Sequence, residues 1–240
     1  MKNFLGALAF ATAFTFAQSA SALIITATLD SFESTPISVS GIGTGGGRAS
    51  FTLTGSDAVI PTNLSSVLDA SFQAVCLEPN EFISTGVEYQ FLVTDLAFAP
   101  TATGGMGVAR EALVEAVLGR LGVTTVEAMD LTRVGAVTGL VYEAGYEASA
   151  NPLDLGAGTA VVTGVGTAEA QVALASFDPQ LTNVDAFALI NLGPVGGFTT
   201  RTVFQGQDFV VTQASVVPSP GPLALMGFGM LGLVGLRKFV

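Results

Sequence analysis

The segment Met106-Gly-Val-Ala-Arg-Glu-Ala-Leu-Val-Glu-Ala-Val-Leu-Gly-Arg-Leu121 decides the fold class of this 240-residue chain. Its apolar residues recur at helical spacing, whereas Arg110, Glu111 and Glu115 mark the opposite side. A second helix is predicted over residues 125–146, and its apolar face comprises Ala128, Leu131, Val134, Val137 or Thr138, and Val141. Both apolar faces are expected to pack on a sheet.

Segments with the patterns of β-strands lie on both sides of this helical part. The predicted strands are 23–29, 37–42, 48–54, 72–77 and 88–94 before it, and 160–163, 186–191 and 209–212 after it, with a short helix over 169–177. Segments 37–42 and 48–54 are predicted to form a hairpin, joined by a flexible turn over the glycine-rich residues 43–47. The order of strands, two helices and strands predicts an α+β fold: one antiparallel β-rich domain with two inserted helices.

Composition excludes several classes of function. The chain has no histidine and one cysteine, Cys76, which rules out histidine-dependent triads, most zinc sites and an internal disulfide. Residues 23–216 contain no lysine, and their 19 acidic and five basic side chains give a formal charge of −14. A domain this acidic is repelled by phosphate backbones, so we expect no nucleic acid partner.

The first 22 residues have the pattern of a signal peptide. Lys2 precedes an apolar run from Phe4 to Ala17, and Ala20 and Ala22 form the small-residue site that signal peptidase requires. We therefore predict cleavage before Leu23 and export of the domain over residues 23–216.

Residues 217–240 form a three-part tail. Val217, Pro218, Ser219 and Pro220 open a proline-rich stretch, an uncharged apolar segment covers 222–236, and Arg237 and Lys238 follow it. The apolar segment is near the lower length limit for crossing a bilayer, and the basic pair is expected to stop transfer on the cytoplasmic side. The alternative to a processed tail is a permanent C-terminal membrane anchor.

This tail resembles the PEP-CTERM sorting signal of Gram-negative bacteria, in which a proline motif, a small-residue-rich apolar helix and a basic end are recognised by an exosortase, a membrane protease. Ser219 stands where the family's motif usually has glutamate. The resemblance implies signal peptidase, an exosortase-like protease, the inner membrane and extracellular polysaccharide as partners. It also implies a tethered precursor that later reaches the cell surface, the extracellular space or a biofilm matrix.

A second resemblance involves Cys76. Residues 72–143 resemble PEP-CTERM proteins that are themselves similar to the thioester domains of bacterial adhesins, in which a strand cysteine bonds to a glutamine side chain. Val134 occupies the place of that glutamine and Thr138 the place of a tryptophan, so the resemblance suggests the fold but not the thioester. From the residues alone, Cys76 is expected to be a buried apolar group that faces the same way as Phe72 and Ala74, with pairing between molecules as the alternative.

Two clusters of oxygen-bearing side chains are candidate sites. The carboxylates of Glu78, Glu81 and Glu88 lie close in sequence, as in acid-based hydrolases, but such spacing is expected by chance in so acidic a chain. An irregular calcium site would use Asp178, Gln180, Thr182, Asn183 and Asp185, although the EF-hand glycine and glutamate are absent. The alternative for residues 178–185 is a capped turn with a structural role only.

These patterns favour a non-catalytic exported surface or matrix protein without a cofactor or an assigned metal site. The alternative is an adhesin-like binding module, calcium-dependent or not, held by a permanent anchor. A secreted hydrolase built on carboxylates alone ranks third.

Overall fold

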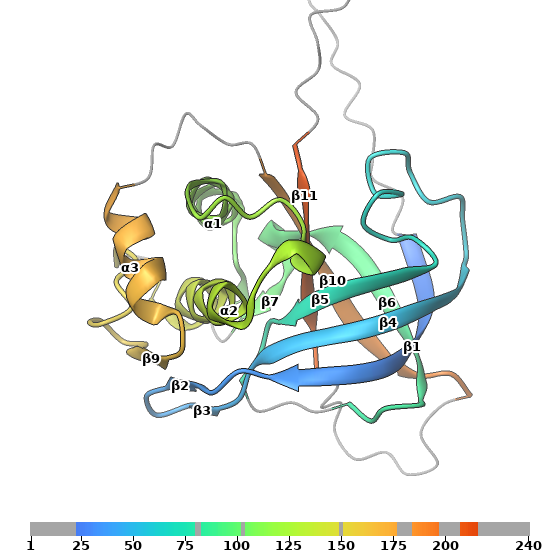
Figure 1. The fold of residues 1–240 in the computed structure, drawn as a ribbon, viewed down its shortest axis with the longest axis horizontal. Coiled ribbons are helices and arrows are strands. Elements are labelled where there is room, and N and C mark those ends of the chain that lie inside the picture. Colours follow the sequence, from blue (N-terminus) through green and yellow to red (C-terminus); the bar gives the residue numbers. More distant parts are fainter. Residues whose placement is uncertain are drawn as a thin grey trace, which may run out of the picture.

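The computed structural model describes residues 23–79, 83–101, 104–148, 151–176, 184–196 and 207–215. A closed antiparallel barrel forms one half of the molecule, and three α-helices form a layer against one side of it (Figure 1). The predicted α+β class is therefore confirmed. The sheet closes on itself, which removes the two exposed edges that an open sheet would have.

Six strands make the barrel, in the order β1-β4-β5-β11-β10-β6. Along β1 and β4, buried and partly exposed side chains alternate, as expected where one face of a sheet lines a core. Their bounds are β1 Leu23–Ser34, β4 Gly47–Ser56, β5 Ser71–Cys76, β6 Glu88–Asp95, β10 Val184–Pro194 and β11 Phe209–Ala214.

Aromatic side chains fill the barrel interior. The Phe51 ring on β4 stacks on Phe72 of β5 at 5.2 Å between ring centroids. It also makes edge-on contacts with Phe91 of β6 and Phe209 of β11, at 5.4 and 5.1 Å. All four rings are buried. Edge-to-face and offset pairs of this kind contribute about 0.5–1.5 kcal/mol each beyond the area that they bury.

The helical layer begins with α1, Val108–Arg120, which packs against β10, and continues with α2, Leu131–Tyr146, and α3, Thr167–Ser176. Two single-turn 3-10 helices, η1 (Leu96–Phe98) and η2 (Val126–Ala128), lead into this layer. Short strands complete the fold: β2 Ile37–Val39, β3 Gly43–Thr44 and β9 Val162–Gly164 form one small sheet, and β7 Pro100–Thr101 pairs with β8 Gly104–Gly105. Among the described residues, no helix combines the length and hydropathy needed to cross a membrane.

The predicted hairpin of 37–42 with 48–54 is wrong. Strand β2 pairs with β3 and β9, whereas β4 pairs with β1 and β5. The two segments have compatible strand patterns, but β1 continues to Ser34 and takes the β4 edge that the hairpin would have used. Both segments alternate like strands, so this pattern by itself does not choose between the two possible partners.

Two further predictions on the helices need correction. The second helix begins at Leu131 rather than near residue 125, because the Asp130 side chain accepts a hydrogen bond from the Arg133 N–H and caps it there. Residues 134–145 of α2 are buried on every side, because α1, α3, β9 and the barrel surround the helix. The prediction that α2 packs a single apolar face on a sheet is therefore wrong.

On α1, Ala109 is exposed and Leu113 half-buried, so Val114, Val117 and Leu118 form the buried face.

The barrel has two distinct ends. Because neighbouring strands are antiparallel, β1 begins, and β6 and β11 end, at the same end of the barrel. Leu23 and Ala214 therefore lie at this end, which we call the proximal end. The opposite, distal end is where β1 and β5 end and β4 and β11 begin.

Candidate functional site

A pocket of about 100 Å³ lies at the distal end of the barrel. Among the described residues, its apolar lining comes from four side chains, Phe32, Pro79, Ile83 and Phe209. Ser34 and Gln207 supply its polar side-chain groups. We call this feature the distal pocket.

Glycine backbone forms one wall of the distal pocket. A Cβ atom on Gly45 would collide with the Pro79 carbonyl, and one on Gly46 would stand 2.8 Å from Cγ2 of Thr138 on α2. Both glycines have positive φ, 157° and 141°. The glycine-rich segment, predicted as a flexible turn, is therefore a close-packed connection between β3 and β4, and only glycine fits there.

The part of the pocket next to Pro79 is fixed by hydrogen bonds to the Glu78 carbonyl. The Tyr142 hydroxyl on α2 donates to it at 3.0 Å, and Nε2 of Gln207 donates at 2.8 Å. Nε2 also donates to the Asp208 carbonyl at 3.1 Å. These bonds join α2, the segment after β5 and the start of β11, which holds Pro79 in the pocket lining.

Cys76 lies inside the barrel close to this pocket. It pairs with Phe209 across β5 and β11, and its thiol is buried and free. Burial raises the pKa of the thiol far above its ordinary value, so the reactive thiolate is suppressed. The expectation of a buried apolar cysteine is confirmed. Val134 and Thr138 lie buried on α2, and the Thr138 hydroxyl donates to the Val134 carbonyl at 2.8 Å.

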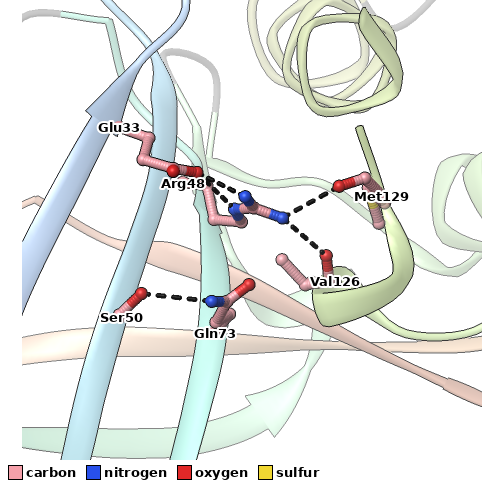
Figure 2. Close-up of polar contacts among 6 residues, drawn as sticks. All are labelled: Glu33, Arg48, Ser50, Gln73, Val126 and Met129. Atoms are coloured by element: carbon pink, nitrogen blue, oxygen red, sulfur yellow. Dashed lines mark hydrogen bonds and ion pairs between the residues drawn. The ribbon is translucent and has the colours of Figure 1, made fainter. Parts of the chain in front are cut away.

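A polar cluster joins the outer face of the barrel to the loop that precedes α2 (Figure 2). Arg48 on β4 forms an ion pair with Glu33 and donates through Nη1 to the Met129 and Val126 carbonyls, at 2.9 and 3.5 Å. Its side chain is 14% exposed, so these bonds form away from bulk water. A guanidinium can satisfy several acceptors at once, and here it fixes η2 against the barrel.

The same face holds a second link between these elements. Nε2 of Gln73 on β5 donates to the Ser50 hydroxyl at 3.2 Å, and the Gln73 backbone N–H donates to the Glu127 carboxylate at 2.8 Å. Both hydrogen bonds are formed between residues of this chain. We therefore assign this cluster a structural role.

Buried carboxylates surround the end of α2. The Glu147 carboxylate accepts hydrogen bonds from Asn151 and from the backbone N–H groups of Ala148, Thr159 and Ala160. Burial raises its pKa, but these four bonds outweigh that effect and lower the pKa to about 2. Glu147 is therefore an ionised anchor for the loop at 158–160.

Glu143, one turn earlier, is in the opposite situation. Its Oε1 accepts from the Asp154 N–H at 3.0 Å, whereas Oε2 is buried with no hydrogen-bond partner among the described residues. Burial, together with the nearby charges of Glu147 and Asp154, raises its pKa to about 7. The Arg110 guanidinium lowers that pKa in part, while it donates to the Ala144, Glu147 and Ala148 carbonyls and caps the helix.

The acidic side chains of α1 were expected on its side away from the core, but they contact the protein. Glu111 accepts from the Ala97 N–H at 3.1 Å and Glu115 from the Ala186 N–H at 3.0 Å. Partial burial raises the pKa of both, that of Glu115 to about 7, and nearby acidic groups contribute. They bind backbone groups at the proximal end of the barrel, which no sequence pattern indicated.

The sites predicted from the sequence fall largely outside the described residues. The signal cleavage residues Ala20 and Ala22, the motif Val217, Pro218, Ser219 and Pro220, the apolar segment 222–236 and the basic pair Arg237 and Lys238 all lie there. So do Glu81 and the calcium candidates Asp178, Gln180, Thr182 and Asn183. Glu78 follows β5 and Glu88 begins β6, both at the distal end. Within the described part of the chain, no three acidic or cysteine side chains gather as metal ligands would.

No protein-family model matches this chain, and no curated protein and no solved structure is significantly similar to it.

Proposed function

We propose that this chain is an exported, non-catalytic surface or matrix protein that an exosortase-like protease processes at its C-terminal tail. Signal peptidase removes residues 1–22, the tail over 217–240 holds the precursor in the inner membrane, and cleavage near Pro220 releases the domain or transfers it to the cell surface. Extracellular polysaccharide is the proposed environment of the product.

One structural observation carries this proposal: the barrel closes with strands that all lie between Leu23 and Ala214. Strand β1 starts at Leu23, directly after the predicted cleavage site. Leu23 already pairs with Val93 of β6. Cleavage there would leave every strand pair of β1 intact, and removal of the tail would leave β11 intact. Both terminal segments are thus dispensable for barrel closure.

The position of the two chain ends also supports the proposal. Leu23 and Ala214 lie at the proximal end of the barrel. A domain held by a tail after Ala214 would therefore have its proximal end toward the membrane and its distal end toward the outside. The tail would be accessible to a membrane protease without opening of the barrel.

Three carboxylates of the helical layer support a non-catalytic domain. Glu115, Glu143 and Glu147 each accept a backbone N–H, and Glu147 accepts three. Groups engaged in this way hold loops and strands in place, and their shifted pKa values have a structural explanation.

The absence of lysine from residues 23–216 gives a sharp test. A fully processed product has one primary amine, that of Leu23, whereas a retained tail adds Lys238. Intact mass and the number of amine-reactive labels would be measured on protein recovered from the medium and membranes of its host, with and without the exosortase.

We expect one label and loss of the tail only when the exosortase is present. Ser219→Glu, which restores the family's usual residue, is expected to raise the processed fraction, and Ser215→Glu is the control that adds the same charge outside the motif. Two labels and an intact tail in both strains would refute processing and would favour the anchored binding module.

A further inference from the structure

The distal pocket is a candidate site for a small molecule. Its volume is about 100 Å³, and most of its lining is apolar. The Phe209 ring is fully buried, whereas the Phe32 ring at the end of β1 is 43% exposed. Phe32 is therefore accessible to a ligand. Concave, mostly apolar pockets with a few fixed polar groups are the usual form of small-molecule sites.

Gln207 provides the fixed polar group. Its side chain is 95% buried, and Nε2 donates both of its protons, to the Glu78 carbonyl at 2.8 Å and the Asp208 carbonyl at 3.1 Å. These two bonds fix the orientation of the amide, because a flipped amide would lose both. No described residue donates to Oε1, which is left as a hydrogen-bond acceptor in a pocket that Gln207 lines.

The electrostatic surroundings restrict the ligand further. Among the described lining residues there is no cationic side chain, and the nearby Arg48 is occupied by Glu33 and two backbone carbonyls. The formal charge of residues 23–216 is −14. This net negative charge disfavours a phosphate or carboxylate ligand. The pocket therefore suits a neutral molecule with a hydrogen-bond donor and an apolar face.

A pyranose sugar has these properties. Its hydroxyl groups donate hydrogen bonds, and the C–H groups on one face carry partial positive charge, which the negative face of an aromatic ring attracts. We infer that the distal pocket binds one neutral sugar residue, with a hydroxyl donating to Oε1 of Gln207 and a C–H face packed on Phe32. This inference goes beyond the proposed function, because it holds whether the tail is cut or retained.

Saturation-transfer NMR would test it on the full chain in a zwitterionic detergent that lacks a sugar headgroup. The probes are the methyl glycosides of glucose, galactose, mannose and N-acetylglucosamine, with methyl acetate and toluene as apolar competitors. We expect transfer to the C–H protons of at least one glycoside. Phe32→Leu is expected to weaken this binding about two- to tenfold. Phe98→Leu, at a 67% exposed ring on η1, is the matched control and should leave binding unchanged.

Gln207→Met keeps the side-chain volume but removes the acceptor, and it should abolish transfer in a chain whose folding circular dichroism confirms. If this variant does not fold, the comparison of Phe32→Leu with Phe98→Leu decides the outcome. Absence of transfer to all four glycosides, equal transfer in the Phe32 and Phe98 variants, or displacement by toluene alone would each overturn the inference.

Discussion

The stability of this protein should fall as the pH rises from about 4.5 to 7, and Glu143→Gln should remove a large part of that fall. The folded-state pKa of Glu143 is about 7, against an ordinary value of 4.5. Between these two values the folded protein keeps a proton that the unfolded chain has released. Higher pH therefore favours unfolding, and the effect is complete above pH 7.

The magnitude follows from the size of the shift. One pKa unit corresponds to about 1.4 kcal/mol, so ionised Glu143 lowers the free energy of unfolding by about 3 kcal/mol. Glutamine keeps the acceptor for the Asp154 N–H and carries no charge. The variant should match the wild type near pH 4.5 and exceed its stability by about 2–3 kcal/mol at pH 8.

Urea unfolding of the full chain at pH 4.5, 6 and 8 would measure this difference. Part of the decline should persist in the variant, because the pKa of Glu115 is also raised to about 7. Glu169→Gln is the control: its carboxylate is 40% exposed and 3.8 Å from Arg133, so its effect should be below about 1 kcal/mol. Parallel loss of stability in wild type and Glu143→Gln would refute the burial argument.

Three further substitutions test contacts of the helical layer. Gly158→Ala should lower the free energy of unfolding by about 2 kcal/mol or more, because φ is +98° and the new Cβ would collide with the Glu147 carboxylate. Gly156→Ala is the control, since a Cβ there makes only an ordinary contact. In the same urea assay it should cost less than about 0.5 kcal/mol. Arg110→Met removes the donors to the carbonyls of Ala144, at the end of α2, and of Glu147 and Ala148, which follow it. The free energy of unfolding should fall by about 2–4 kcal/mol, seen as a lower thermal midpoint, and hydrogen exchange should become faster at the end of α2. Arg48→Met removes two carbonyl contacts and an ion pair and should cost about 1–3 kcal/mol, with faster exchange in η2; no change in exchange there would contradict the role assigned to Arg48.

The pH profile has an acid side as well. The pKa of Glu147 is lowered to about 2, so its contribution is present above pH 4.5 and is lost as the pH falls toward 2. With Glu115 and Glu143 acting in the opposite direction above pH 4.5, maximum stability is expected near pH 4.5–5. A maximum at pH 8 would contradict this assignment.

The sequence was most informative where the signal is local. The apolar spacing from Met106 to Leu121 predicted α1, which spans Val108–Arg120, and the β-type runs predicted the strands of the barrel to within a few residues, except for longer ends of β1 and β10. Helical and strand periodicity depend on neighbours within one or two turns, so a single chain segment contains them. The terminal patterns are equally local and yield the sorting proposal.

The tertiary structure alone decided which segments meet. Strand β2 pairs with β9, more than 120 residues away, and Gln207 bonds to the Glu78 carbonyl across 129 positions. Closure of six strands into a barrel, the distal pocket and the opposite pKa shifts of Glu143 and Glu147 all depend on such contacts. The reason is physical: desolvation and hydrogen-bond partners are properties of the packed surroundings, whereas the spacing of apolar residues is a property of the chain itself.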